Sequence, residues 1–574
     1  MVKISEEIKM IKDKLKLLKK KIKNLKIDGY IVPKNDEFFS EYADKDRLKI
    51  ISNFTGSAGV AIILINKNYL FIDGRYTVQA RQQSGKNFKI VEIHKYLPRN
   101  ILKNLTLGVD PSIFTEKQLK PFINKSIKIK YIEKNLIDEI FQDKKNKINK
   151  IFSISNKVAG ESYFSKIKKI RLILKKNHTD YLFISAPENV AWILNIRGWD
   201  NPNSPIPNCR CIISKTGKIF LITKKIKANN LIKENKLGST QIIEPERFKN
   251  LINNLNGSRF IIDENTCSIL NKSIINSKFK IKVMKDPCYQ LKAIKNSSEI
   301  QNMIDAHIQD GVALTKFIFW IKKKNKKSIT EIDAKKKLEK FRNLNKNYLR
   351  PSFQTISGTG SNAALPHYIV TKKSNKTIKK TDIFLCDSGG QYKYGTTDVT
   401  RTLCFTKPKN KIKDIFTKVL KGHIAVVTTN LKKNKTGKKI DLRARKYLKK
   451  DNLDYAHGTG HGVGFFSNVH EGPQGITKNN NIKIEEGMIV SNEPGYYKKN
   501  EFGIRIENLI YVKKLNKNLY FENLTLAPID KDLINFRILN EDEKNYLFKY
   551  HLNVYSKISK YLNKPERKWL SGQI

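Results

Sequence analysis

Three of the chain's nine histidines fall within eighteen residues, in the segment AHGTGHGVGFFSNVHEGP at 456–473. His457, His461 and His470 stand there among glycines, which the interior of a helix or strand does not favour. Imidazole rings so close together can bind a metal ion, transfer a proton or donate hydrogen bonds to a substrate. A surface turn is the alternative for a glycine-rich segment, so the residues around it decide between the two.

Two aspartates lie upstream of this loop, on strands that the pattern predicts to be neighbours. A buried strand at 383–385 runs into Asp387, and Gly389-Gly390 then turns the chain. Asp398 and Thr400 share one face of the next strand because side chains alternate along a strand. A buried carboxylate without a partner is costly, so this pair of aspartates needs a cation.

Two glutamates follow downstream of the loop. Glu493 lies at a strand end, before a Pro-Gly turn. The alternation of the returning strand places Arg505 and Glu507 on the face opposite Ile504. We therefore expect Glu507 to be a buried acid in the middle of that strand, again in need of a partner.

Each of these acids alone is more often structural than a ligand, but together they form a set with His461. Four carboxylates and one imidazole are hard, oxygen-rich ligands that suit a pair of divalent ions such as Mn²⁺ better than a thiolate zinc site. Glycines beside His461 allow the backbone to approach a metal ion or a substrate closely. The residues thus favour a dinuclear metal centre.

The domain that carries this set begins with a long helix. Ser297-Ser298-Glu299 can cap its start, and Ile300, Met303 and Ile304 keep helical spacing after it. We place this third domain at 289–574, with a C-terminal extension from about 525.

The first half of the chain contains a repeat. A short strand, a polar turn and a hairpin occur at 27–76, and the same order returns at 179–225. Two related α/β domains in tandem are the economical interpretation. We place them at 1–150 and 151–288, with the lysine-rich stretch at 143–150 as the boundary.

Composition limits the function classes. The formal net charge of +58 comes mostly from lysines spread over all 574 residues, whereas specific nucleic-acid recognition favours clustered arginines and aromatic residues. The longest notable apolar run, VAIILI at 60–65, is too short to span a membrane, and the N-terminus lacks the apolar core of a signal peptide. The six cysteines lack C-x-x-C spacing, which favours free thiols in the cytoplasm.

Six motifs in order, LCDSGGQY, GTTDVTRT, HGTGHGVG, VHEGP, NEPGYY and FGIRIEN, resemble the catalytic domain of aminopeptidase P, the Xaa-Pro aminopeptidases. This family belongs to the pita-bread group, with prolidase, methionine aminopeptidase and creatinase. The resemblance covers nearly the whole chain, and DGRY, ENVAWILNIRG and LTLAPID are similar to the long, three-domain form. It implies an α/β (α+β) fold, with two tandem creatinase-N-like α/β domains before a C-terminal pita-bread catalytic domain.

The resemblance also implies roles for individual residues. The metal ligands would be Asp387, Asp398, His461, Glu493 and Glu507, with Asp398 and Glu507 bridging two divalent ions, which we expect to be Mn²⁺, with Zn²⁺ or Co²⁺ as alternatives. The substrate-side histidines would be His367, in ALPHY, with His457 and His470. Leu365-Pro366 stands where the family would be expected to have two small or β-branched residues before the histidine, and Phe465-Phe466 replaces a smaller residue that often stands there.

The activity implied is release of the first residue of a peptide with proline second, by a hydroxide that bridges the two ions. Glu493 would carry the proton to the leaving nitrogen, His470 or His367 would stabilise the oxyanion, and Arg505 would orient the carboxylates from behind. The expected partners are such peptides and a second copy of the chain, as a homodimer, with no specific nucleic acid and no membrane.

Three alternatives remain open. A prolidase-type dipeptidase would use the same site, although a prolidase has a single N-terminal domain. A metal-free, creatinase-like hydrolase or an inactive scaffold would keep the fold and lose ligands. A basic, non-enzymatic nucleic-acid-binding protein is suggested by the net charge alone.

Overall fold

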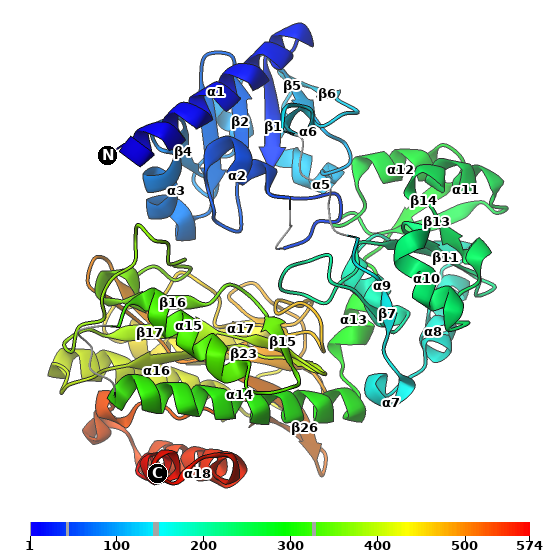
Figure 1. Ribbon diagram of the computed structural model, residues 1–574. Helices are drawn as coiled ribbons and strands as arrows, with labels where there is room; N and C mark the ends of the chain where they lie inside the picture. The colour runs from blue at the N-terminus through cyan, green and yellow to red at the C-terminus, as the bar shows by residue number, and fades with distance from the viewer. Residues whose placement is uncertain (1, 42–44, 142–147, 324–328) are drawn as a thin grey trace. The chain divides into compact units, whose positions relative to one another are not determined.

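The computed structural model describes residues 2–41, 45–141, 148–323 and 329–574 (Figure 1). The chain divides into two compact units. The first comprises Met1–Ile154, Glu161–Pro202 and Ile206–Cys288, and the second comprises Ser155–Gly160, Asn203–Pro205 and Tyr289–Ile574. Most of the lysine-rich stretch that we expected at the first boundary lies outside the described residues.

The first unit contains two six-stranded sheets with the same strand order. One has the order β4-β3-β2-β1-β5-β6 and the other β12-β11-β10-β8-β13-β14. The first sheet consists of β1 Gly29–Pro33, β2 Val60–Leu64, β3 Asn68–Ile72, β4 Lys89–Glu92, β5 Leu105–Val109 and β6 Ile127–Tyr131. The second consists of β8 Tyr181–Ile184, β10 Arg210–Ser214, β11 Ile219–Ile222, β12 Ile242–Ile243, β13 Arg259–Ile262 and β14 Lys280–Val283.

The two sheets also share their strand directions. β1 pairs antiparallel with β2 of its hairpin and parallel with β5, and β8 pairs in the same two ways with β10 and β13. Each central strand is buried along its whole length, as its continuous apolar run predicts. The predicted tandem of α/β domains is therefore confirmed.

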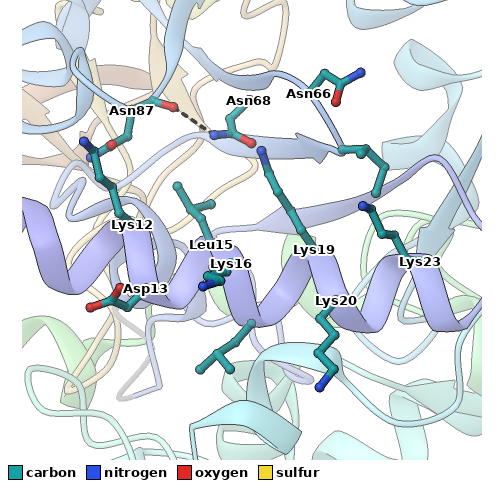
Figure 2. A pocket seen from close by; sticks show the side chains of 12 residues that line it. Lys12, Asp13, Leu15, Lys16, Lys19, Lys20, Lys23, Asn66, Asn68 and Asn87 are labelled. Atoms are coloured by element: carbon teal, nitrogen blue, oxygen red, sulfur yellow. Dashed lines mark hydrogen bonds between the residues drawn. The ribbon is translucent and has the colours of Figure 1, made fainter.

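The N-terminal helix α1, Val2–Asn24, covers the first sheet with one face. Ile11, Leu15, Leu18 and Ile22 are buried there at helical spacing. Beside it lies a hollow of about 970 Å³, shown in Figure 2. Its polar lining consists of Lys12, Asp13, Lys16, Lys19, Lys20, Lys23, Asn66, Asn68 and Asn87. This basic hollow contains none of the residues that we predict to bind metal.

The second unit surrounds small antiparallel sheets with helices. Figure 1 shows α15 beside β16, and α14 packs against α15 and β19. The helices are α13 Cys288–Ala293, α14 Ser297–Lys323, α15 Glu331–Arg342, α16 Asn410–Val427, α17 Gly437–Lys449, α18 Glu541–Ile558 and α19 Lys564–Ser571. The strands are β15 Tyr348–Pro351, β16 Ile356–Thr359, β17 Phe384–Ser388, β18 Gly390–Tyr392, β19 Gly395–Thr396, β20 Val399–Leu403, β21 Gly460–His461, β22 Gly475–Ile476, β23 Ile489–Asn492, β24 Gly495–Lys498, β25 Phe502–Arg505, β26 Asn508–Leu515 and β27 Asn518–Asn523.

The strands of this unit form sheets of two or three. The three-stranded sheets are β16-β17-β20, β15-β18-β19 and β23-β26-β27, and the pairs are β24-β25 and β21-β22. β17 is buried at all five positions, and so is β20. The antiparallel pairing of β17 with β20 positions Asp387 and Asp398.

Two details of this unit differ from the sequence-based expectations. The cap of α14 is Asn296 rather than the two serines: its Oδ1 accepts from the Glu299 amide at 3.0 Å, and the Glu299 carboxylate accepts from the Asn296 amide at 3.1 Å. The cap lies one residue earlier because the reciprocal pair needs Glu299 at the third helical position.

The predicted returning strand is also interrupted. β25 ends at Arg505 and pairs with β24, whereas β26 begins at Asn508 and pairs with β23 and β27. Glu507 lies in the break between β25 and β26, not in the middle of one strand. The chain changes partners there, and the Glu507 amide donates instead to Thr400 O at 3.1 Å.

Two further expectations can be compared with the structure. All six cysteines are buried and free. Among the described residues, no helix combines the length and apolarity that crossing a membrane requires.

Candidate metal centre

The two aspartates come together through the register of β17 and β20. Asp387 stands opposite Thr400, and Ser388 stands opposite Val399, so Asp398 comes just before β20 on the face that carries Asp387. Gly389 makes the connection possible because a Cβ there would lie 1.9 Å from Thr397 O. Only a residue without a side chain lets the chain leave β17 so close to the approach to β20.

The glycines around His461 have the same physical cause. A Cβ on Gly460 would lie 1.9 Å from Ser491 O, so β21 approaches β23 more closely than any other residue type would permit. The His461 amide donates to Ser491 Oγ at 2.9 Å. This close approach brings the ring to the end of β23, where Glu493 follows.

The His461 ring lies between two of the acids. Its Nε2 is 3.5 Å from Asp398 Oδ2 and 3.6 Å from Glu493 Oε1. Glu507 is held nearby, where its Oε2 accepts from Thr400 Oγ1 at 2.7 Å. Ligand atoms of Asp398, His461 and Glu507 all lie within 4.8 Å of one another.

The remaining two residues of the predicted ligand set lie around this group of three. Glu493 is held by its amide, which donates to Thr459 O at 2.8 Å. Asp387 is buried, and its Oδ2 accepts from Arg505 Nη2 at 2.6 Å. The structure thus gathers all five predicted ligands in one region of the second unit.

Electrostatics in this region calls for a cation. Burial raises the pKa of Asp387 to about 7, with Asp398 and Glu493 adding to the shift and Arg505 opposing it. Burial also raises the pKa of Glu507 well above its usual value, and the neighbouring acids raise it further. Buried carboxylates gathered this closely are costly unless positive charge beyond the Arg505 guanidinium lies among them.

One atom marks where such a charge fits. Among the described residues, Asp387 Oδ1 is buried and has no hydrogen-bond partner. A buried carboxylate oxygen is rarely left unpaired, and here it belongs to a set of oxygens with one imidazole, the donors that hard divalent ions prefer. The residues present therefore fit a divalent metal centre.

Arg505 stands behind the acids. Its guanidinium donates to Asp387 Oδ2, to Thr400 Oγ1 at 3.0 Å and to Tyr497 Oη at 2.5 Å. A planar group with a fixed set of donors can hold three partners in one geometry. These three partners are more than a single salt bridge to Asp387 would provide.

The three predicted substrate-side histidines occupy different places around the acids. The His470 ring packs edge-on against the His461 ring, with centroids 4.1 Å apart. His457 Nδ1 bonds to Gly458 O at 2.7 Å and its Nε2 to Tyr497 Oη at 2.8 Å. Burial lowers the pKa of His457 well below its usual value, with Arg505 and His367 adding to the shift. His367 is partly exposed, one residue after Pro366, whose carbonyl accepts from Arg505 at 3.4 Å.

Tyr497 is a site residue that the sequence reasoning missed. Its hydroxyl lies between His457 and Arg505, and burial raises its pKa to about 12. The observed strand register explains its place: Gly495 pairs with Arg505, so Tyr497 lies on the Arg505 face of the β24-β25 pair.

A second group of possible ligands lies elsewhere in this unit. Cys404, Asp530 and Asp532 have ligand atoms within 4.8 Å of one another. Lys322 already pairs with both of these carboxylates, at 2.5 and 2.7 Å. Its ammonium group satisfies the charge there, in contrast to the cluster around Asp398.

Comparison with known families covers the chain from residue 14 to its last residue, with short gaps. Metallopeptidase family M24 matches residues 301–514, and the C-terminal region of that peptidase family matches 517–574. Two families described as creatinase/prolidase N-terminal domains match 14–129 and 142–299. The two N-terminal matches correspond to the two sheets of the first unit.

Individual relatives match over nearly their whole length. A Laccaria bicolor protein named "Probable Xaa-Pro aminopeptidase P" is 36% identical over 95% of this chain and 90% of its own. "Xaa-Pro aminopeptidase 1" of Dictyostelium discoideum is 36% identical over 96% of this chain and 94% of its own.

Solved structures agree with these matches. The X-prolyl aminopeptidase of Caenorhabditis elegans, described as a cytosolic enzyme with a di-nuclear active site, is 29% identical, covers 98% of this chain and 99% of its own, and has a TM-score of 0.90. The prolidase of Thermococcus sibiricus covers 64% of this chain at a TM-score of 0.53 and shares the fold. The chain belongs to metallopeptidase family M24, among the Xaa-Pro aminopeptidase P proteins with two creatinase-type domains before a pita-bread catalytic domain.

Proposed function

We propose that this protein is a metal-dependent aminopeptidase that hydrolyses the bond between the first residue of a peptide and a proline in second place. The observation that carries the proposal is the grouping of Asp398, His461 and Glu507, beside three further histidines, in a chain that matches Xaa-Pro aminopeptidases along nearly its whole length. The prolidase alternative is disfavoured by the presence of two N-terminal domains in this chain, only 64% of which the prolidase structure covers.

The centre would hold two divalent ions, with Asp387, Asp398, His461, Glu493 and Glu507 as ligands and Asp398 and Glu507 shared between them. Carboxylates dominate this set, which supports Mn²⁺ over a thiolate-preferring ion, with Zn²⁺ and Co²⁺ as the other candidates. Bound there, such ions activate water and polarise the scissile carbonyl group.

The chain's own residues then have distinct tasks. Glu493, the ligand that directly follows β23, moves a proton from the attacking water to the proline nitrogen. His470, whose ring packs edge-on against His461, donates a hydrogen bond to the developing oxyanion, with His367 as a second donor. Arg505 and Tyr497 hold Asp387 and His457 in place.

Specificity for proline follows from these donors. A peptide bond to proline nitrogen has no N–H, so a peptidase cannot use that hydrogen to place the substrate. Histidines can instead position the substrate by donating hydrogen bonds to its carbonyl oxygens, which a proline peptide still has. A substrate that leaves a buried donor unpaired is strongly disfavoured.

Three further properties belong to this proposal. The chain would act in the cytoplasm, as its C. elegans neighbour is described to do, and as a homodimer. Its domains would be 1–150, 151–288 and 289–574, with the C-terminal extension from about 525. Sedimentation of the purified protein measures its oligomeric state and so tests the dimer.

Cleavage of matched peptides tests the proposal. We expect release of the first residue from an Xaa-Pro-Xaa tripeptide, much slower release from the Xaa-Ala equivalent, and loss of activity with a chelator. His470→Ala should lower kcat by two to three orders of magnitude, roughly the effect of losing one transition-state donor, with metal content unchanged.

Two results would contradict these expectations. Equal rates of cleavage of the proline and alanine peptides would exclude the proposed Xaa-Pro aminopeptidase activity. An unimpaired His470→Ala enzyme would exclude the role of that histidine while leaving the activity itself intact.

A further inference from the structure

Two lysines at the start of the second unit bind one glutamate in the histidine-rich loop. Lys292, in α13, donates to Glu471 Oε2 at 2.8 Å, and Lys295, in the connection to α14, donates to Glu471 Oε1 at 2.6 Å. Nearly 180 residues of sequence separate the lysines from the glutamate. We call these three residues the Lys-Glu-Lys clamp.

The clamp is buried almost completely. The side chains are 3% exposed for Lys292, 1% for Lys295 and 2% for Glu471. Burial acts to raise the pKa of Glu471, but the two ammonium groups outweigh burial and hold it below its usual value. Three charges out of water are expensive, and an apolar cluster of the same volume would usually be as stable. Their presence therefore calls for a role in geometry.

Glu471 directly follows His470 and is tied to the turn that follows His461. Its amide donates to Gly462 O at 2.8 Å. The backbones are so close that a Cβ on Gly462 would lie 2.0 Å from Glu471 O, and a Cβ on Gly464 would lie 2.9 Å from Glu471 Oε2. A shift of Glu471 must therefore shift the backbone on both sides of the loop.

The lysine side of the clamp is equally fixed. The Lys295 amide donates to Gly487 O at 3.0 Å, and Ile294 bridges to Met488 just before β23. Gly487 has φ of +81°, and a Cβ there would lie 2.4 Å from Lys295 O. The connection between α13 and α14 is thus attached to β23, the strand that leads to Glu493.

We propose that Lys292 and Lys295 are positioning residues: through Glu471 they hold the His470 ring against the His461 ring. The proposal rests on the role given to His470 in the proposed function. Both lysines act through their hydrogen bonds to Glu471. The clamp connects the first helices of the second unit to the place where the transition state would be stabilised.

The single variant Lys295→Met tests the clamp, because Glu471 keeps Lys292 as a partner and the fold need not fail. We expect kcat on an Xaa-Pro-Xaa tripeptide to fall about ten- to a hundred-fold, the size of an error of about 1 Å in placing a catalytic group, with KM changed less than about threefold. Metal content should equal that of the wild type.

A double-mutant cycle with His470→Ala identifies the route of the effect. If the clamp acts through His470, adding Lys295→Met to His470→Ala should cost less than about twofold in kcat. The control is Lys322→Met, which breaks another buried ion pair of the same unit, to Asp530, and should leave kcat within about twofold of the wild type.

Hydrogen exchange of the backbone amides gives a readout that does not depend on activity. Exchange of residues 462–471 should be faster in Lys295→Met and unchanged in Lys322→Met. Wild-type kcat and exchange in Lys295→Met would overturn the clamp, and so would full additivity with His470→Ala. If the wild type failed to cleave the peptide while exchange changed as expected, the proposed function alone would be contradicted.

Discussion

Asp398 is the residue at which the candidate centre is most sensitive, because it faces both His461 and Glu507. We expect Asp398→Asn to fold normally, to lose at least one metal ion and to lose activity. An amide has the shape of the carboxylate but supplies neither its charge nor a second anionic oxygen. Metal analysis and peptide cleavage measured on one sample provide the check.

Full metal content and normal turnover in Asp398→Asn would remove this residue from the ligand set. Asp382→Asn is a suitable control, since this aspartate accepts hydrogen bonds from Thr359 and the Lys379 amide and lies outside the proposed site. It should retain both metal and activity.

Residue types alone identified the acids and the histidines, but not the network behind them. Asp387, Asp398, Glu493 and Glu507 could be singled out because a buried acid without a partner is expensive. Tyr497 carries no such cost in the sequence, since a tyrosine in a strand is ordinary core material. Its position between His457 and Arg505 depends on the pairing of β24 with β25, which becomes visible in three dimensions.

At the level of elements, the turn between β17 and β18 controls the distance between the two aspartates. We expect Gly389→Ala to lower both stability and metal content, because its Cβ would lie 1.9 Å from Thr397 O and 2.2 Å from Ser352 Oγ. The backbone before Asp398 would have to move to make room. Thermal unfolding and metal analysis of the purified variant measure the two effects.

Gly238→Ala is the matched control for this substitution. A Cβ there meets nothing nearer than 3.6 Å, and the backbone is in an ordinary extended conformation, so the variant should unfold like the wild type. If Gly389→Ala behaved like Gly238→Ala, the turn would be more tolerant than its geometry indicates.

The elements were predictable where a pattern is continuous. The two tandem sheets followed from a repeated strand and hairpin, and the β17-β20 pair followed from alternation around Asp387 and Asp398. The break at Ile506–Glu507 was not predictable, because alternation of side chains continues through it. Only the exchange of partners, from β24 to β23, interrupts the strand there.

Stability of the second unit should depend on pH through a histidine that is not among the predicted ligands. His551, in α18, accepts from the Ile529 amide at 3.0 Å, and burial lowers its pKa to about 4, with Arg401 and Lys531 adding to the shift. The unfolded chain binds a proton near pH 6.5, whereas the folded chain resists it. The contribution of His551 to the free energy of unfolding is therefore fully present above about pH 6.5. It is lost as the pH drops toward 4, by about 3 kcal/mol at most.

Calorimetry of His551→Gln at two pH values measures this contribution. Glutamine retains an acceptor for the Ile529 amide but does not titrate. Between pH 7.5 and pH 5, we expect the unfolding temperature of the variant to fall less than that of the wild type. Equal losses would show that His551 does not govern the acid sensitivity of this unit.

The net charge of +58 is a property of the whole molecule rather than of a site. Among the features described above, lysines are most concentrated in the hollow beside α1. Lys12, Lys16, Lys19 and Lys23 share one face of that helix there (Figure 2). Such a surface attracts phosphates without reading bases, because sequence is read by fitted donors on the base edges. We therefore expect duplex DNA to bind weakly, without preference among sequences.

Salt dependence distinguishes this attraction from a true nucleic-acid function. Binding that consists of released counterions falls steeply between 50 and 200 mM salt, by roughly a thousandfold or more when six or more phosphates are contacted. We expect fluorescence anisotropy to show binding at the lower salt concentration and almost none at the higher one. Replacing Lys16, Lys19 and Lys23 together by Gln should weaken the low-salt binding only in part, since the remaining lysines are spread over the chain. Tight, sequence-selective binding at physiological ionic strength would instead restore the basic binding protein as the leading alternative, with its site to be sought first beside α1.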